Sequence, residues 1–289
     1  MNDAREAAYW SAADDNAVRC GLCPHRCHIK ENASGVCGVR ENRDGALIAS
    51  SYGQISSVAL DPIEKKPLYM FHPGKSILSV GGFGCNLKCR FCQNYEISAE
   101  YDGYRQNARR LLPDDVVSLA LQTVSEGNIG VAYTYNEPLI GYEFVYDCAK
   151  LVHENGLFNI LVTNGYINEQ PLVNLLPLID AMNIDLKGFT EEFYKNVGGD
   201  LDTVKNTIAL SAENCHVEVT TLVIPGENEG DVTEIAKWLA SIDAGIPLHL
   251  SRFFPRYQYN DRSPTPREAI LRLCEAAGKH LKYVFAGNI

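Results

Sequence analysis

Ten cysteines carry the most reactive side chains of this chain, and seven of them lie within its first 92 residues. The seven fall into two tight groups, which are Cys20, Cys23, Cys27 and Cys37, followed by Cys85, Cys89 and Cys92. Thiolates select soft metals and iron–sulfur clusters, so both groups are candidate metal sites. The remaining three stand alone in apolar or periodic segments, and we expect them to be small buried side chains: Cys148, Cys215 and Cys274.

The second group, in the run CNLKCRFC, has the spacing C-x3-C-x2-C. It follows an apolar run at 77–80, and Gly81, Gly82 and Gly84 allow the backbone to turn sharply between the two. A cubane cluster has four irons, so three thiolates leave one iron open to an exchangeable ligand. Such an iron can bind a small molecule and pass it an electron. The alternatives are a zinc site or a plain electron-transfer cluster, which usually take a fourth nearby protein ligand.

The first group, C-x2-C-x3-C-x9-C, supplies a complete set of four thiolates. It suits a structural zinc, a second iron–sulfur cluster, or free redox thiols, and His25 or His28 could replace one thiolate. Residues 20–43 show little apolar periodicity, so we expect a bound metal to help fold them.

The second group, with Phe91 before its last cysteine, resembles the signature of the radical S-adenosylmethionine (SAM) enzymes. Gln93-Asn94, which follow, resemble the branch of the pyruvate formate-lyase (glycyl radical enzyme) activating enzymes. Nearly the whole chain is similar to the radical SAM member of the AmmeMemoRadiSam system. The segments that carry this similarity are CxLCPHRC, DPIEKKPLYMFHPG, TYNEP, TNGY and the terminal GN.

The resemblance implies a 4Fe-4S cluster on Cys85, Cys89 and Cys92 that binds SAM through its open iron. An electron from a low-potential donor such as ferredoxin or flavodoxin then cleaves SAM into methionine and a 5′-deoxyadenosyl radical. The radical abstracts hydrogen from a glycine of a partner protein, or from a small molecule or peptide. The competing class is a non-enzymatic iron–sulfur or zinc module, which would have fully ligated metals and no affinity for SAM.

Apolar strand-like runs alternate with amphipathic helical segments after the cysteine loop. The expected strands are 77–80, 129–134, 158–163, 181–186, 217–224, 247–252 and, last, 282–285. This rhythm predicts parallel βα units. We expect an α/β fold, a partial (βα)6 TIM-like barrel of the radical SAM type at 76–289. An N-terminal cysteine-rich extension at 1–75 precedes it.

Several further elements are expected. Residues 1–19 are predicted to form a helix or a loose arm, and 46–60 a hairpin around Gly53. Helices are expected at 113–126, from Val232 with a capping box of Asp231 and Glu234, and from Pro266 to about Gly278. Residues 61–72 are expected to form a solvated loop, and the alternative is that their charges line the mouth of the barrel.

Polar residues at the ends of the predicted strands are the further candidates for the site, because barrel chemistry sits at these ends. By resemblance, the expected contacts to SAM or substrate are Asn136, Glu137, Thr163, Asn164, Asp185, Lys187, Val223, His249 and Arg252. Asp185 and Lys187 share one face of their strand, where opposite charges are costly unless they are paired or bound. The structural alternatives are a helix-capping role for Glu137, an Asn-Gly turn at Asn164, an ion pair, and a core role for His249.

The composition and charge of the chain limit the kinds of partner that it can bind. The chain has 289 residues, 46% of them hydrophobic, and a formal net charge of −10, which argues against binding to nucleic acid. It has no run of about 18 apolar residues that could span a membrane. Its first residues contain no apolar signal region, so we expect a cytoplasmic protein without disulfides.

Overall fold

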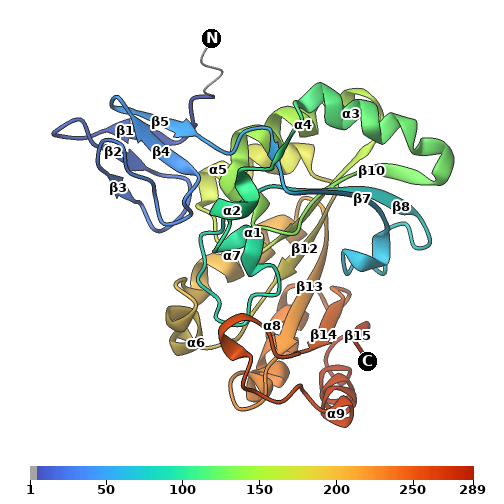
Figure 1. Cartoon of the computed structure of the whole chain (residues 1–289). Coiled ribbons are helices and arrows are strands. Elements are labelled where there is room, and N and C mark those ends of the chain that lie inside the picture. Colours follow the sequence, from blue (N-terminus) through green and yellow to red (C-terminus); the bar gives the residue numbers. More distant parts are fainter. Residues whose placement is uncertain (1–4) are drawn as a thin grey trace.

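The computed structural model describes residues 5–289 and is built around one eight-stranded sheet (Figure 1). The strand order is β15-β14-β13-β12-β11-β10-β8-β7, in which β7 runs antiparallel to β8 and the other neighbours are parallel. The strands are β7 (Ser57–Pro62), β8 (Ser76–Gly81), β10 (Asn128–Tyr133), β11 (Phe158–Thr163), β12 (Ala181–Asp185), β13 (His216–Val223), β14 (Leu248–Arg252) and β15 (Val284–Gly287). The α/β fold with its mostly parallel sheet is therefore confirmed.

Helices alternate with the parallel strands and cover the outside of the sheet (Figure 1). They are α3 (Pro113–Gln122), α4 (Tyr142–Glu154), α5 (Glu169–Leu175), α6 (Glu191–Asn196), α7 (Leu201–Ala212), α8 (Val232–Asp243) and α9 (Arg267–Ala277). In α4, Val145, Cys148, Ala149 and Val152 recur at helical spacing and are buried. Cys148 is thus the buried side chain that we expected, whereas Cys215 and Cys274 are only half-buried at the edge of the core.

The N-terminal region consists of short antiparallel strands. A three-stranded sheet is formed by β1 (Trp10–Ala12), β2 (Val18–Cys20) and β3 (His28–Ile29), so the prediction of a helix or loose arm is wrong for residues 5–19. A hairpin joins β4 (Arg40–Arg43) to β5 (Ala46–Ala49). Its turn is Asp44-Gly45, with φ of 52° and 79°, as a tight hairpin requires.

The hairpin predicted around Gly53 is wrong. The short strand β6 (Gln54–Ile55) pairs instead with β9 (Arg109–Arg110), and β7 joins the main sheet. Residues 57–62 of the expected extension thus belong to the main sheet through β7. The two regions share one apolar core, in which Val18, Leu22 and Leu47 pack with residues of the barrel.

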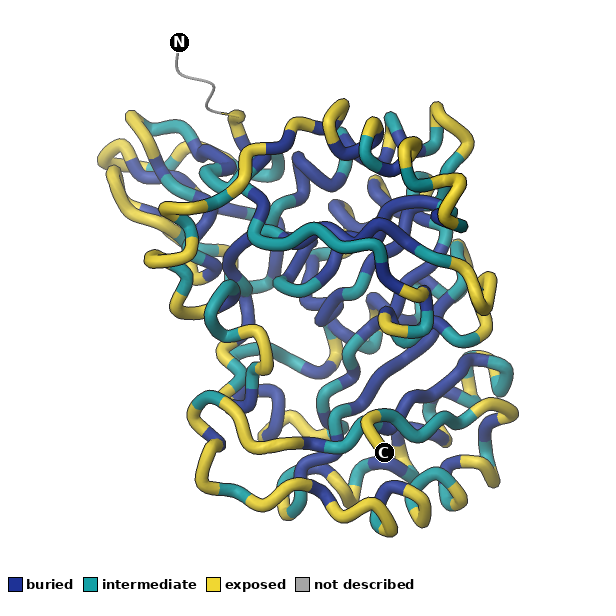
Figure 2. Tube along the Cα trace, turned by 45° about the vertical axis from the view of Figure 1, so that its right-hand side comes forward, coloured by how far each residue is buried: buried dark blue, intermediate teal, exposed yellow. Residues whose placement is uncertain are grey.

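Residues 63–75, which connect β7 to β8, are not the solvated loop that we predicted. Ile63 and Leu68 are fully buried against Ile77 and Ala132 of the sheet. The first half of the connection therefore packs against the sheet, whereas residues 72–75 are exposed. Figure 2 shows the buried strands running through the molecule, with exposed segments concentrated at the outer turns.

Two helix starts differ from the prediction. Asp231 does not cap α8 with its side chain. It accepts a hydrogen bond from the Phe189 amide at 2.7 Å, while Glu234 pairs with Lys237. Pro266 is the N-cap of α9 instead of its first helical residue, and Gly278 ends that helix as predicted.

Candidate active site

A single cavity gathers the ends of the parallel strands and the second cysteine group. Its volume is about 340 Å³, within the roughly 300–1,000 Å³ of an ordinary ligand pocket. From the expected site residues it is lined by Cys85, Cys89, Phe91, Cys92, Asn136, Glu137, Thr163, Asn164, Asp185 and Lys187. The cavity therefore has the size of an ordinary ligand pocket and opens to the outside beside the cysteine loop.

The cysteine loop leaves β8 through a close approach to the N-terminal region. Gly84 has a φ of +84°, and a Cβ atom there would lie 2.6 Å from the Cys37 carbonyl oxygen, so only glycine fits. Asn136 fixes the same turn from β10. Its Oδ1 accepts from the Gly82 amide at 2.8 Å, and its Nδ2 donates to the Phe83 and Gly84 carbonyls.

The three cysteines of the loop are half-buried and line the cavity. Burial raises the pKa of Cys89 to about 11, and it also raises the pKa values of Cys85 and Cys92. Lys187 opposes this effect at Cys89 and Cys92. Such thiols ionise on binding a metal, and three soft donors on one cavity wall fit a cluster with an open iron.

Glu137 ties two strand ends together at the cavity wall. Its side chain is 3% exposed, and it accepts hydrogen bonds from Thr163 Oγ1 at 2.6 Å, the Asn164 amide at 2.8 Å and the Leu139 amide at 3.0 Å. Burial raises the pKa of Glu137 to about 7, against the effect of these donors. The Leu139 bond is the helix-capping role considered from the sequence. A contact to SAM stays a prediction.

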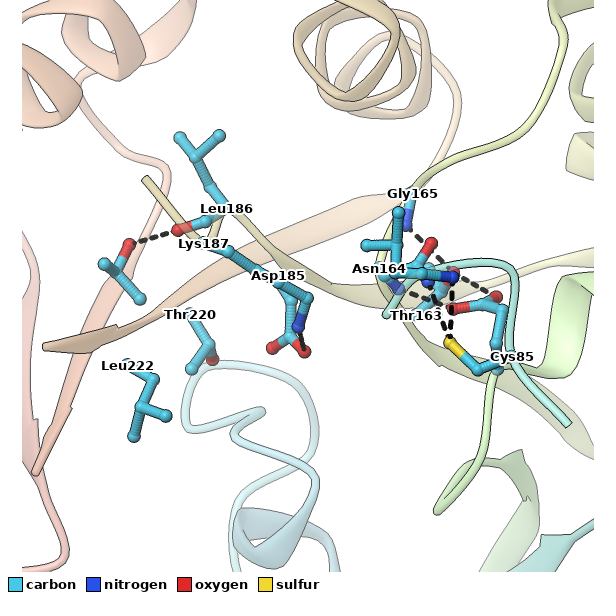
Figure 3. Close-up of polar contacts among 12 residues, drawn as sticks. Cys85, Thr163, Asn164, Gly165, Asp185, Leu186, Lys187, Thr220 and Leu222 are labelled. Atoms are coloured by element: carbon cyan, nitrogen blue, oxygen red, sulfur yellow. Dashed lines mark hydrogen bonds and ion pairs between the residues drawn. The ribbon is translucent and has the colours of Figure 1, made fainter. Parts of the chain in front are cut away.

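Asn164 connects this network to the cysteine loop (Figure 3). Its Nδ2 lies 3.6 Å from Cys85 Sγ and donates to Asn86 Oδ1 at 3.0 Å. Its Oδ1 accepts from the Tyr166 amide at 2.8 Å, which fixes the orientation of the amide group. A hydrogen bond to a ligand sulfur changes the reduction potential of an iron–sulfur cluster. Asn164 is therefore placed to adjust the potential of a cluster held by Cys85.

Asp185 and Lys187 form the ion pair that their shared strand face suggested. Lys187 Nζ lies 2.8 Å from Asp185 Oδ2, and the side chains are 15% and 37% exposed, respectively. Burial disfavours the charged form of Lys187, but the nearby Asp185 and Cys89 outweigh the effect of burial and raise the pKa of Lys187. The pair therefore keeps a cation beside the cysteine loop, at the centre of Figure 3.

Three expected site residues lie outside this cavity, and their assignments are corrected. His249 is buried and bonds Glu218 Oε2 through Nε2 at 2.6 Å, the core role considered as its alternative. Arg252 donates from Nε to the Thr265 carbonyl at 2.9 Å. Val223 is fully buried on the opposite face of β13 from Leu222, which does line the cavity.

The cavity also includes side chains that sequence reasoning missed. They are Ser98, Thr220 and Leu222, whereas Lys65, Lys66 and Ser251 belong to segments that the sequence already suggested for the barrel mouth or the site. Alternation along β13 would have found Thr220 and Leu222 once one inward residue was known.

The first cysteine group packs behind the cysteine loop. Cys20, Cys23 and Cys37 are buried and Cys27 is half-buried. Burial raises the pKa of Cys23 to about 12. Among residues 5–289, no three or more His, Cys, Asp or Glu side chains are arranged to hold one metal ion. Thiolates of one zinc must converge on that ion, and both zinc and a second cluster stay predictions for this group. A cubane places each thiolate on a different iron and does not impose this geometry.

Comparison with known proteins identifies the family. The Radical SAM superfamily model matches residues 79–239. The "Uncharacterized protein MJ0808" of Methanocaldococcus jannaschii is 42% identical over 99% of this chain and 85% of its own length. The pyruvate formate-lyase 1-activating enzyme of Escherichia coli is 26% identical over 51% of this chain, which spans 61% of that enzyme.

Two solved structures share the fold. Streptococcus suis SuiB bound to S-adenosylmethionine has a TM-score of 0.54 and 14% identity, over 70% of this chain and 47% of that chain. TYW1 with a lysine-pyruvate adduct has a TM-score of 0.51 and 16% identity, over 78% and 84%. No helix within residues 5–289 is long and apolar enough to cross a membrane. With its family match spanning the cysteine loop and most of the barrel, the chain belongs to the radical SAM superfamily and is a distant relative of the glycyl radical activating enzymes.

Proposed function

We propose that this chain reductively cleaves SAM and uses the product to abstract hydrogen from a substrate, as the radical SAM member of the AmmeMemoRadiSam system. The observation that carries the proposal is the meeting of Cys85, Cys89 and Cys92 with the Asp185–Lys187 pair in one cavity. When bound, a 4Fe-4S cluster supplies one electron to SAM, which yields methionine and a 5′-deoxyadenosyl radical.

The residues of the chain would bind, orient and shield the reactants. Cys85, Cys89 and Cys92 would hold the cluster, and Asn164 would donate a hydrogen bond to the Cys85 sulfur. Asn136 and Glu137 fix the loop and the strand ends on which this geometry depends. Precise placement of reactants matters more here than acid–base chemistry, because the cofactor carries the difficult step.

SAM would lie between the cysteine loop and the ends of β11 to β14. Lys187 and Asp185 offer a cation and an anion to its carboxylate and amino groups, and Thr163 adds a hydroxyl. Leu222 and Phe91 supply apolar surface for its adenine and ribose and keep water away. A low-potential protein such as ferredoxin or flavodoxin is the donor that this chemistry requires.

Two substrate classes fit the proposal, a glycine of a partner protein and a small molecule or peptide. The similarity to MJ0808 spans 99% of the chain, whereas the activating enzyme matches only 51%, which supports membership of a group separate from the activating enzymes. Comparing turnover with and without the other proteins of the system tests this assignment.

Anaerobic reconstitution tests the central claim. We expect the protein, incubated with dithionite and SAM, to release 5′-deoxyadenosine and methionine in equal amounts. Cys274→Ala is a matched control, because Cys274 is a half-buried thiol outside the cavity and its loss should leave cleavage intact. A protein that binds iron but makes no deoxyadenosine would be an electron-transfer module instead.

A further inference from the structure

The connection between β7 and β8 brings a group of charges into the cavity. Lys65 and Lys66 line the same cavity as the cysteines and the Asp185–Lys187 pair. Lys66 Nζ lies 2.8 Å from Asp61 Oδ2, and Lys65 Nζ lies 3.1 Å from Asp61 Oδ1. Tyr135, directly after β10, donates its hydroxyl to Asp61 Oδ2 at 2.7 Å.

Lys66 is held in the barrel interior by its surroundings. Its side chain is 3% exposed, whereas that of Lys65 is 66% exposed. The backbone beside it is anchored, because Asn183 Nδ2 donates to the Pro67 carbonyl at 2.8 Å. Two further amides of the connection donate to Glu218, and neighbouring apolar residues are fully buried. Lys66 is therefore a fixed part of the cavity wall.

The charges of this group do not cancel. Asp61 carries one negative charge and serves two lysines, so the three side chains together leave one positive charge. Burial opposes the charge of Asp61, but the hydrogen bonds from Lys66, Tyr135 and Lys65 outweigh it and lower its pKa. Burial lowers the pKa of Lys66, although Asp61 opposes that effect. Lys66 is paired with Asp61, and the surplus charge lies with Lys65, whose side chain is 66% exposed, so an anion that enters the cavity meets a net positive charge.

The ammonium group of Lys66 can donate a hydrogen bond to a ligand while it stays bonded to Asp61. An ammonium has three N–H donors, and the hydrogen bond found for Lys66 within residues 5–289 is the one to Asp61. Its Nζ also lies 4.6 Å from the centre of the Tyr135 ring, which favours the charged form. The pale blue chain of the β7–β8 connection passes near Thr220 and Asp185 in Figure 3, so this wall adjoins the predicted SAM site.

We propose that Lys66, supported by Asp61, Tyr135 and Lys65, forms an anion subsite that binds a carboxylate or phosphate group of the substrate. The inference rests on the proposed function, because it assigns the substrate end that is remote from the cysteine loop. An acidic group anchored at Lys66 would direct the rest of the substrate into the cavity, toward the bound SAM.

Anion binding can be measured without turnover. Equilibrium dialysis of the reconstituted, SAM-loaded protein would use radiolabelled inorganic phosphate in one arm and radiolabelled succinate in the other. We expect one equivalent of at least one anion to bind, and the preferred arm shows whether the substrate is phosphorylated or carboxylic. Lys66→Met should weaken binding about 10- to 100-fold, the usual effect of losing a hydrogen bond to a charged group.

Matched variants distinguish specific anion binding at Lys66 from non-specific attraction by positive charge on the surface. Lys66→Arg should bind within a few-fold of the wild type, and Lys65→Met should lose less affinity than Lys66→Met. Binding of neither anion by the wild type, unchanged binding by Lys66→Met, or equal losses in the two methionine variants would overturn the inference. Thermal melting of each variant checks its folding, and Lys66→Arg preserves the test if Lys66→Met unfolds.

The deoxyadenosine assay separates this inference from the proposed function. A wild-type protein that binds phosphate through Lys66 but never cleaves SAM would sink the proposed function and leave an anion site. A protein that cleaves SAM while binding neither anion would sink the inference alone.

Discussion

The two cysteine groups of this chain lie in neighbouring regions but face different surroundings. Cys85, Cys89 and Cys92 line a cavity, where an incomplete ligand set can accept a further molecule. Cys20, Cys23 and Cys37 are buried between the N-terminal strands and the back of the cysteine loop. A ligand set with access to a cavity suits reaction chemistry, and one without it suits structural support. Access, more than the number of thiols, distinguishes the two groups.

The N-terminal region and the active-site cavity are connected through Asn86, which contacts residues of both. The His25 ring nitrogen lies 2.7 Å from the Asn86 carbonyl, and Asn86 Oδ1 accepts from Asn164 at 3.0 Å. Asn86 Nδ2 also donates to the Tyr166 carbonyl at 2.7 Å. The residue that follows Cys85 is thus fixed from both sides. The N-terminal region therefore supports the cysteine loop, and its loss should reach the active site.

The largest expected effect follows from removing a thiol that faces the cavity. Cys85→Ala, Cys89→Ala or Cys92→Ala should abolish deoxyadenosine formation, because two thiolates cannot hold a stable cubane here. Product and iron are measured after anaerobic reconstitution, with Cys274→Ala as the control. Deoxyadenosine release by any one of the three cavity variants would contradict the assignment of this loop.

A buried ion pair that joins the two regions predicts the next effect. Arg40 on β4 and Glu143 on α4 lie 2.9 Å apart with side chains 2% and 4% exposed. Glu143→Ala leaves a buried guanidinium without its partner and should lower the free energy of unfolding by about 3–5 kcal/mol. Urea titration measures this loss.

An exposed pair between the same two regions is the control. Arg5 and Asp147 lie 2.9 Å apart, but their side chains are 48% and 26% exposed. Arg5→Ala should therefore cost at most about 1 kcal/mol. If Glu143→Ala cost no more than Arg5→Ala, the N-terminal region would not be clamped to the barrel through this pair.

Local patterns explain what the sequence predicted well. The cysteine loop is contiguous in the chain, and all seven expected parallel strands end within two residues of their predicted bounds. Buried parallel strands are continuous apolar runs with polar or glycine-containing ends. This pattern can be recognised in the sequence without knowing which strands pair with one another. The N-terminal strands are only two to four residues long, too short for periodicity to mark them.

Long-range partners explain what the sequence could not show. Asp61 is buried because Tyr135, 74 residues later, donates to it, so the first half of the segment read as a solvated loop packs against the sheet. His249 is satisfied by Glu218, which is 31 residues away, and no local pattern marks this pair. Val223 and Leu222 are both apolar, so composition alone did not show which of them faces the cavity.

The pH dependence of Glu218 tests the stability of the barrel interior. Burial opposes its charge, but hydrogen bonds from His216, His249 and two amides of the β7–β8 connection lower its pKa from 4.5 to about 2. The folded state then binds fewer protons than the unfolded state, so stability falls as the pH falls from about 4.5 to about 2. The loss should reach about 3 kcal/mol.

Unfolding free energies at several pH values between 6 and 2 give this contribution. Glu218→Gln lacks the titrating group, so its stability should change less over this window than that of the wild type. Parallel curves for the two proteins would show that Glu218 does not stabilise the barrel through its charge.

The smallest expected effect concerns the N-terminal thiols and sharpens the contrast with the cavity. If Cys23 acts only as a small buried side chain, Cys23→Ala should cost about 1–2 kcal/mol, the range for removing a few buried atoms. If a structural metal folds this region, the loss should be far greater, since such sites contribute on the order of 10 kcal/mol. The thiol positions within residues 5–289 favour the smaller value for a single ion.

Urea titration and limited proteolysis near residues 20–45 measure the loss, and Cys215→Ala, a half-buried thiol outside both groups, is the control. Iron analysis completes the test, because roughly four irons per chain correspond to one cubane and roughly eight to two. Eight irons falling to four in Cys23→Ala would show that the first group holds a cluster of its own.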